Sequence, residues 1–177
     1  DGAVATYTPT VNWNGTDTFT YKANDGTVDS NTSTITVTVT AVNDVPVASD
    51  VSASTNEDTA KDITLSATDV EGSSLTYSVV ATNDGSVSIS GATATYTPDS
   101  NWNGTDTFTY KANDGTDDSN TSTVTITVAA VNDAPTTTDI STTIDENRTA
   151  RMVGITLQGT DIDGDDLTYS VVTDASN

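Results

Sequence analysis

The sequence predicts an all-β protein built from tandem two-sheet sandwiches, and three observations carry that prediction. Threonine supplies 39 of the 177 residues, whereas Phe, Leu, Lys and Glu are scarce, which is typical of strands rather than helices. Apolar residues alternate with Thr in short runs bounded by Asn, Asp and Gly, as half-buried strands do. Finally, residues 1–44 align with 90–133 without a gap, and 36 of the 44 positions are identical.

The spacing of the two copies gives a repeat period of 90 − 1 = 89 residues. The stretch from Asp69 to Val80 also returns as Asp161 to Val172, at an offset of 161 − 69 = 92. We therefore expect three units: the C-terminal half of a repeat at 1–44, a complete repeat at 45–133, and the N-terminal half of a further repeat at 134–177. The two half-repeats are complementary, so they indicate either a window of a longer array or a subunit that a neighbour completes.

The complete repeat predicts about seven short strands. The residues expected to share a strand face are, in chain order, Ile63, Leu65 and Ala67; Leu75, Tyr77 and Val79; Ala94 and Tyr96; Phe108, Tyr110 and Ala112; and Val124, Ile126 and Val128. Their alternation with Thr, Ser and Lys favours sheets with one solvated face, and the regular turn signals favour a sandwich. Pro46 and Pro135 follow the expected junctions, where Pro can open a strand.

Composition excludes several classes of function. The chain has no Cys and no His, which excludes disulfides, thiol nucleophiles, a Ser-His-Asp triad and Cys/His zinc sites. A net charge of −21 disfavours nucleic acid and anionic membrane surfaces as partners. No apolar run approaches the roughly 18 residues of a membrane span, so we expect no direct membrane insertion. We also expect no enzyme, because no second catalytic residue type accompanies the carboxylates.

The acidic residues gather where strands end, beside short Asn-Asp-x-Pro linkers. The positions are Glu57, Asp58, Asp69, Glu71, Asp114 and Asp133, followed by Glu146, Asp161, Asp163, Asp165 and Asp166. Any one of them is explained by the preference of Asp and Asn for turns. The repeated set, however, favours a calcium site, because calcium takes six to eight oxygen ligands and loops at one domain end can supply them.

These segments resemble cadherin repeats. Residues 67–72, Ala-Thr-Asp-Val-Glu-Gly, and 75–78, Leu-Thr-Tyr-Ser, resemble the Ala-Thr-Asp-x-Asp and Tyr-Ser segments of that family. The Ala-Asn-Asp-Gly turn at 112–115 and the Val-Asn-Asp-Ala-Pro linker at 131–135 resemble the end of a cadherin repeat. The block from Tyr-Thr-Pro to Asn-Gly-Thr-Asp-Thr-Phe-Thr-Tyr is similar to cadherin-like tandem repeats of large bacterial surface adhesins.

The resemblance covers essentially the whole chain and implies immunoglobulin-like sandwiches with calcium held between consecutive domains. It implies one ligand set around linker 43–44, made of Asn43, Asp44, Asp69, Glu71 and Asp114. It implies a second set around linker 132–133, made of Glu57, Asn132, Asp133, Asp161 and Asp163, with Glu146 as a further candidate. The Asp-Arg-Glu element of cadherins is absent and Glu71 replaces an Asp, so we expect fewer ions or weaker binding.

We therefore expect a calcium-stiffened extracellular array that serves as the stalk or spacer of a surface adhesin. One alternative is the building block of a secreted extracellular filament, whose half-domains are completed by an identical subunit. A second alternative is a multivalent lectin-like adhesin, in which Trp13 and Trp102 stack on a sugar, although such residues more often close a sandwich core. In the spacer interpretation the partners are neighbouring repeats, and any glycan or cell-surface ligand binds outside this segment.

Overall fold

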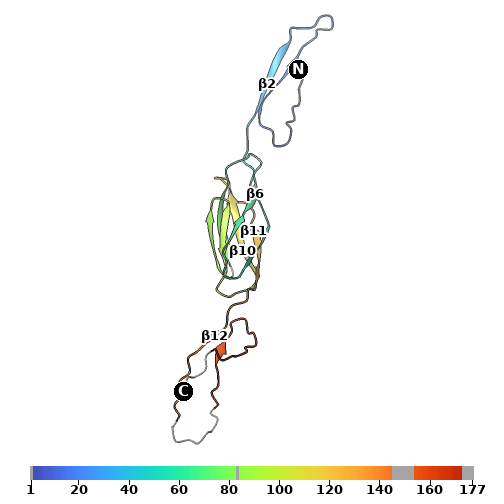
Figure 1. Cartoon of the computed structure of the whole chain (residues 1–177). Helices are drawn as coiled ribbons and strands as arrows, with labels where there is room; N and C mark the ends of the chain where they lie inside the picture. Colours follow the sequence, from blue (N-terminus) through green and yellow to red (C-terminus); the bar gives the residue numbers. More distant parts are fainter. Residues whose placement is uncertain (1, 83, 145–153, 173–177) are drawn as a thin grey trace.

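The structure is a computed structural model that describes residues 2–82, 84–144 and 154–172, and these residues form strands and loops without a helix. Figure 1 shows an elongated molecule in which a central body lies between an N-terminal hairpin and a smaller C-terminal part. No helix long and apolar enough to cross a membrane occurs in the described part of the chain.

Thirteen strands are assigned among the described residues. They are β1 (Gly15–Tyr21), β2 (Ser33–Val39), β3 (Val47–Ser49), β4 (Val51–Asn56), β5 (Lys61–Thr64), β6 (Ser66–Thr68), β7 (Thr76–Thr82), β8 (Ser86–Ser90), β9 (Thr93–Thr97), β10 (Gly104–Asn113), β11 (Ser122–Ala129), β12 (Thr136–Thr137) and β13 (Gly159–Thr160).

The central body is a two-sheet sandwich made of β3 to β11. One sheet has the order β4-β11-β10-β7, in which β10 is antiparallel to both neighbours and β4 is parallel to β11. The opposite side consists of the sheet β5-β9-β8 and the antiparallel pair β3-β6. The predicted inward faces are confirmed, since the buried core includes Ile63, Leu65, Ala94, Tyr96, Phe108, Tyr110, Val124, Ile126 and Val128.

The predicted strand through Ile63, Leu65 and Ala67 is interrupted. β5 pairs with β9, whereas β6 pairs with β3, and Leu65 between them donates its N–H to Ala92 O at 2.8 Å. The break lets one stretch of chain pair with two different partners, as β3 and β4 do on either side of Asp50. If β3 and β4 are counted as one interrupted strand, and β5 and β6 as another, the nine segments from β3 to β11 correspond to seven strands, as predicted.

Trp102 packs against the edge of the core rather than standing free. It lies in the loop between β9 and β10, it is half-buried, and it contacts the core cluster. Its ring covers Gly104, where an added Cβ would lie 3.3 Å from Trp102 Cζ2. This contact confirms the core role for Trp102, whereas the equivalent Trp13 in the N-terminal hairpin is 39% exposed.

The N-terminal hairpin repeats part of the sandwich. β1 pairs with β2 from Gly15↔Val39 to Tyr21↔Ser33, which is the register of β10 and β11 moved by 89 residues. Residues 2–10 form no strand, although they match the segment that contains β9. The reason is that β9 is held between β5 and β8, and this hairpin has no equivalent of either within the described residues.

The C-terminal part contains only the pair β12-β13 among its described residues, in the register of β3-β6. Residues 165–172 match the segment that includes β7 but form no strand. β7 receives its hydrogen bonds from β10, and the C-terminal part has no such neighbour in the described structure.

Candidate functional site

Two junctions connect the central body to the parts on either side. The first junction comprises linker 40–45 with the loops that contact it, and the second junction comprises linker 129–135 with its loops. The acidic residues predicted as ligands are divided between them, so each junction is described in turn.

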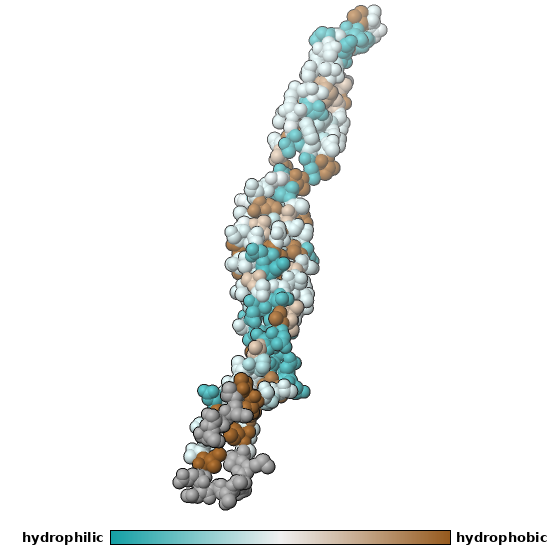
Figure 2. All heavy atoms as spheres, viewed as in Figure 1, coloured by the Kyte–Doolittle hydropathy of each residue, from teal (hydrophilic) through white to brown (hydrophobic). Residues whose placement is uncertain are grey.

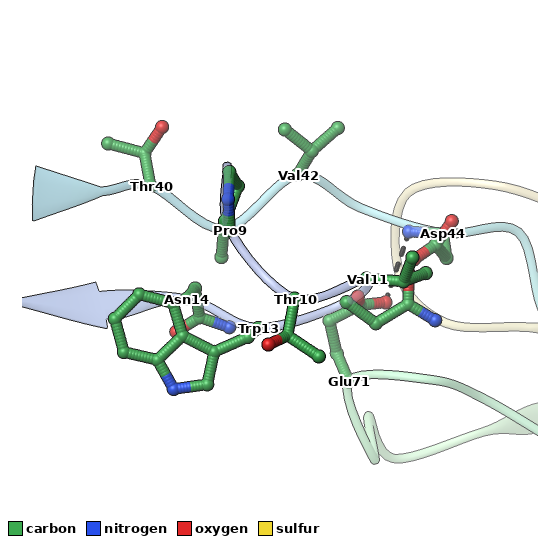
Figure 3. A pocket seen from close by; sticks show the side chains of 11 residues that line it. Pro9, Thr10, Val11, Trp13, Asn14, Thr40, Val42, Asp44 and Glu71 are labelled. Carbon is green, nitrogen blue, oxygen red and sulfur yellow. Dashed lines mark hydrogen bonds between the residues drawn. The ribbon is translucent and has the colours of Figure 1, made fainter. Parts of the chain in front are cut away.

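At the first junction, the linker forms hydrogen bonds with the two loops of the central sandwich that carry Glu71 and Asp114. Asn43 Nδ2 donates to Asp114 Oδ2 at 2.9 Å and to Asp117 Oδ2 at 3.1 Å. The Asp44 N–H donates to Glu71 Oε2 at 3.0 Å, as the dashed line in Figure 3 shows. The structure thus brings Asn43, Asp44, Glu71 and Asp114 together in pairs, and the longer Glu71 side chain still reaches the linker.

The turn between β10 and β11 orients Asp114. Its Oδ1 accepts from the N–H groups of Thr116 and Asp117, both at 2.7 Å, which leaves Oδ2 for Asn43. These contacts, with the Asp117 N–H largest and the Asn43 amide next, hold the pKa of Asp114 below the ordinary aspartate value. At the distal end of the N-terminal hairpin, Asp25 makes the same turn with Thr27 and Val28.

Asp69 has a carboxylate oxygen without a partner. Its Oδ1 accepts from the Ser73 N–H at 2.8 Å, whereas Oδ2 is buried and has no hydrogen bond. A buried carboxylate oxygen that lacks a donor is costly in an anionic neighbourhood, and a cation would satisfy it.

At the second junction, Glu57 anchors the linker to the sandwich. Its side chain is 4% exposed, its Oε1 accepts from the Val131 N–H, and its own N–H donates to Ala129 O at 2.9 Å. Farther along, the Asp133 N–H donates to Asp163 Oδ2 at 2.7 Å. This bond is the counterpart of the contact between Asp44 and Glu71, so both linkers dock on the next unit in the same way.

Asn101, from the loop that also carries Trp102, adds a contact that the sequence analysis missed. In the orientation that satisfies its amide, Asn101 Nδ2 donates to Asp58 Oδ2 at 3.2 Å and to Asp133 Oδ2 at 2.9 Å. Asp58 in turn accepts from the Asn101 N–H through Oδ1 at 3.0 Å. The available signal was the Asn-Trp-Asn-Gly block, which occurs in both copies and whose glycine is the first residue of β1 and of β10.

At the second junction, several carboxylates surround Asp133. Desolvation raises the pKa of Asp133 above the ordinary aspartate value, and the nearby carboxylates Asp163, Asp58, Glu57 and Asp161 raise it further. Four carboxylates therefore repel the charged form of Asp133 at this linker. Their mutual repulsion makes the junction a place where a cation would be favoured.

Each junction also has an open pocket made from equivalent elements. The pocket at the first junction, of about 310 Å³, is lined by the Asn12–Trp13 loop, linker residues and Glu71 (Figure 3). The pocket at the second junction, of about 580 Å³, is lined by Asn101, Asp133 and Asp161. Asn12 and Asn101 share a positive φ, of 59° and 54°, and each is followed by a Trp whose N–H donates to the residue three positions earlier, so both loops contain the same turn.

The remaining predicted ligands do not converge in the same way. Asn132 Nδ2 donates to Asp133 O at 2.9 Å, and Asp161 Oδ1 accepts from the N–H groups of Asp163 and Asp165. Glu146 lies outside the described residues. Among the residues that the structure describes, no group of three or more acidic side chains is arranged so that it could hold a metal ion as it stands.

Comparison with known structures gives partial likenesses. An endo-fucoidan hydrolase of glycoside hydrolase family 107 is 24% identical, and a variant of that enzyme is 26% identical, both with a TM-score of 0.43. Each match covers 70% of this chain but only 20% of the enzyme, so the chain spans about a fifth of those proteins. At this similarity the match carries no argument about activity. No curated protein matches the chain.

The sequence profile described as "Bacterial Ig domain" matches residues 1–38 and 43–127, which is more than half of the chain. This match agrees with the all-β sandwich and bears out the resemblance to immunoglobulin-like repeats of bacterial surface proteins. Bacterial Ig domains are a non-enzymatic fold family, and they typically occur in surface or extracellular proteins. The chain belongs to the bacterial Ig domain family.

Proposed function

We propose that the chain is a calcium-stiffened spacer of an extracellular bacterial surface protein, organised as units 1–44, 45–133 and 134–177. The observation that carries the proposal is the equivalence of the two junctions. In both, a linker Asp donates its N–H to an acidic residue of the following unit, and a loop Asn with positive φ lies beside the linker. A contact that recurs with the repeat belongs to the array rather than to one unit.

Calcium fits the donor set at the first junction. Asn43, Asp44, Asp69, Glu71 and Asp114 offer carboxylate and amide oxygens, which are the ligands that calcium prefers. The buried Asp69 Oδ2 that lacks a partner supports a cation there. We add Asp117 to the candidate ligands, because its carboxylate lies at the linker, where it accepts a hydrogen bond from Asn43.

At the second junction, calcium would be held by Glu57, Asp133, Asp161 and Asp163, with Asp58 added by its contact with Asn101. Turned about its last side-chain bond, the Asn101 amide would present its oxygen rather than its nitrogen to Asp58 and Asp133. Three oxygens would then face one another, an arrangement that requires a cation. Bound calcium would neutralise the repulsion that raises the pKa of Asp133.

A stiff junction serves a spacer because it fixes the distance between the ends of an array. Carboxylates at an unneutralised junction repel one another and favour bent arrangements that separate them. The charge of −21 and the packed position of Trp102 are both compatible with a spacer whose recognition domain lies elsewhere.

The test is small-angle scattering, coupled to size exclusion so that one species is measured, with and without calcium. At about 5 mM calcium, above the roughly 10⁻⁴ to 10⁻³ M dissociation constants of extracellular modules, we expect a larger maximum dimension than in chelator. Matched NaCl must not reproduce the change. Identical profiles in calcium and chelator would refute calcium stiffening.

Two variants locate the effect. Asp133→Asn removes a carboxylate from the second junction and should weaken calcium binding in calorimetry at least tenfold. Asp62→Asn removes the same charge from β5, where Asp62 only accepts from Thr95, and should bind like the unmodified chain. Equal affinity in the two variants would place the ion away from the second junction.

A further inference from the structure

We propose that two asparagine side chains take the place of a cation at the junctions when no ion is bound. Each bridges two carboxylates through its amide group, and we call such a group of three side chains an amide clip. The first clip consists of Asn43, Asp114 and Asp117, and the second of Asn101, Asp58 and Asp133. The link to calcium rests on the proposed function, whereas the clips are contacts of the calcium-free chain.

The first clip joins the linker to the turn between β10 and β11. Asn43 Nδ2 donates to Asp114 Oδ2 at 2.9 Å and to Asp117 Oδ2 at 3.1 Å. An Asn amide carries two N–H groups, so one is available for each carboxylate. Asp114 Oδ1 is already held by two backbone N–H groups of the turn, which leaves Oδ2 facing the linker. The clip therefore fixes the linker on a turn that the sandwich itself orders.

The second clip joins three segments that are distant in the chain. Asn101 Nδ2 donates to Asp58 Oδ2 at 3.2 Å and to Asp133 Oδ2 at 2.9 Å in the orientation that satisfies the amide. Asp58 Oδ1 also accepts from the Asn101 N–H at 3.0 Å. The turn after β4, the loop before β10 and linker 129–135 thus meet at one amide nitrogen.

The backbone is adapted to this second clip. Among the described residues, three non-glycine residues have a positive φ, namely Asn12, Asp58 and Asn101, with values of 59°, 55° and 54°. Two of them form the second clip, and Asn12 is the sequence counterpart of Asn101. A positive φ is uncommon outside glycine, and it persists where surrounding contacts compensate for its cost. Here the compensating contacts are those between Asp58 and Asn101.

The clip carboxylates lack a basic partner among the residues that the structure describes. The ion pairs found there join Lys22 to Asp29 and Lys111 to Asp118. Figure 2 shows hydrophilic residues gathered where the central body meets the C-terminal part, which is the region of the second clip. Carboxylates brought this close together repel one another. In the calcium-free chain, the amide N–H groups are the donors that oppose this repulsion at each clip.

Asparagine suits a site that also accepts a cation. A lysine would hold the carboxylates together, but it has no acceptor atom and its permanent charge would repel calcium. An asparagine amide has two donors on one side and an acceptor oxygen on the other. Rotation about the last side-chain bond therefore exchanges a group that replaces the cation for a group that binds it. If the proposed function is right, the clips hold the carboxylates in place for the incoming ion.

Two backbone amides report on the clips separately. The Asp44 N–H donates to Glu71 at the first junction, and the Asp133 N–H donates to Asp163 at the second. Hydrogen exchange at these two amides, followed by NMR on the whole chain, measures how often each linker opens. The buffer contains chelator and about 0.15 M NaCl, so that long-range repulsion is screened and short-range contacts dominate.

The variants are Asn43→Ala and Asn101→Ala, which remove the donors without adding charge. Asn43→Ala should accelerate exchange at Asp44 about tenfold and leave Asp133 unchanged, because hydrogen bonds to charged acceptors are lost at one junction alone. Asn101→Ala should do the reverse. Asn103→Ala, at an exposed position in the same loop as Asn101, should change neither amide. Equal acceleration at both junctions in one variant, or no acceleration in either variant, would overturn the proposal.

A repeat of the measurement in about 5 mM calcium separates the clips from the proposed function. Calcium should abolish the acceleration at Asp133 in Asn101→Ala, because the ion then holds the carboxylates that the amide no longer bridges. An acceleration in chelator that persists in calcium would support the clip and refute calcium at the second junction. The absence of any acceleration in chelator would overturn the clip, whatever calcium does.

Discussion

At the scale of single residues, identical side chains acquire different properties at the two junctions. Asp114 accepts hydrogen bonds from N–H donors, which favour its charged form, whereas desolvation and then the neighbouring carboxylates disfavour the charged form of Asp133. The lowered pKa of Asp114 stabilises the fold above the unfolded pKa, and that contribution is lost as the pH falls through the folded pKa. The raised pKa of Asp133 acts oppositely: its contribution is present below the unfolded pKa and is lost as the pH rises through the folded pKa.

We therefore expect the two residues to titrate on opposite sides of the ordinary aspartate pKa of about 3.9 in calcium-free buffer. Side-chain carboxyl chemical shifts followed by NMR against pH measure both in one experiment. Asp25, which makes the same turn as Asp114 and also has a lowered pKa, is the internal control. A pKa for Asp133 at or below that of Asp114 would contradict the charge cluster at the second junction.

At the scale of elements, one tyrosine holds three strands together. The Tyr110 side chain belongs to β10, and its hydroxyl contacts backbone groups of Ser49 in β3 and Ser66 in β6. These contacts cross from one sheet of the sandwich to the other. They secure the short pair β3-β6, which has few hydrogen bonds of its own.

Tyr110→Phe should lower the free energy of unfolding by about 1–3 kcal/mol, because it leaves buried backbone groups without their partner. Denaturant unfolding, monitored by Trp fluorescence, measures the change. Tyr21→Phe is the matched control, because Tyr21 is 53% exposed and the loss of its hydroxyl leaves no buried group without a hydrogen-bond partner. Equal effects of the two substitutions would show that the contacts of Tyr110 add nothing.

At the scale of the whole molecule, charge and shape are linked through the junctions. The net charge of −21 is carried by an elongated molecule (Figure 1), and many of its carboxylates lie at the two junctions. Alignment of consecutive units brings those carboxylates together. If the proposed function is right, the extended shape depends on what neutralises or screens these carboxylates.

In chelator, we expect the maximum dimension to increase as NaCl rises from about 0.01 M to 1 M, because the screening length falls from about 30 Å to 3 Å. The dimension should remain below the value in calcium, since sodium screens the carboxylates without bridging them. Analytical ultracentrifugation gives the frictional ratio for the same series. A frictional ratio that is independent of salt would mean that repulsion does not set the shape.

The sequence by itself determined the strand pattern and the repeat, and it pointed to several residues that contact one another at the junctions. Alternation with Thr placed Phe108, Tyr110 and Val124 in the core correctly, because a strand with one buried face needs apolar residues at every second position. The linker motif also led to Asn43, Asp44 and Asp133, since a motif repeated beside each linker is visible in one dimension. It did not lead to Asp117 or Asn101, which reach the linkers only after distant loops have folded together.

The tertiary structure alone decided which copies of the repeat become ordered sheet. Residues 1–44 and 90–133 are nearly identical, yet Tyr96 lies in a buried strand whereas Tyr7 lies in none. Likewise, the segment that includes β7 is a strand, but its counterpart at 165–172 is not. A strand is a property of a pair, because its hydrogen bonds and its apolar cover come from residues far away in the chain. Sequence encodes the capacity to pair, and only the presence of the partner turns that capacity into structure.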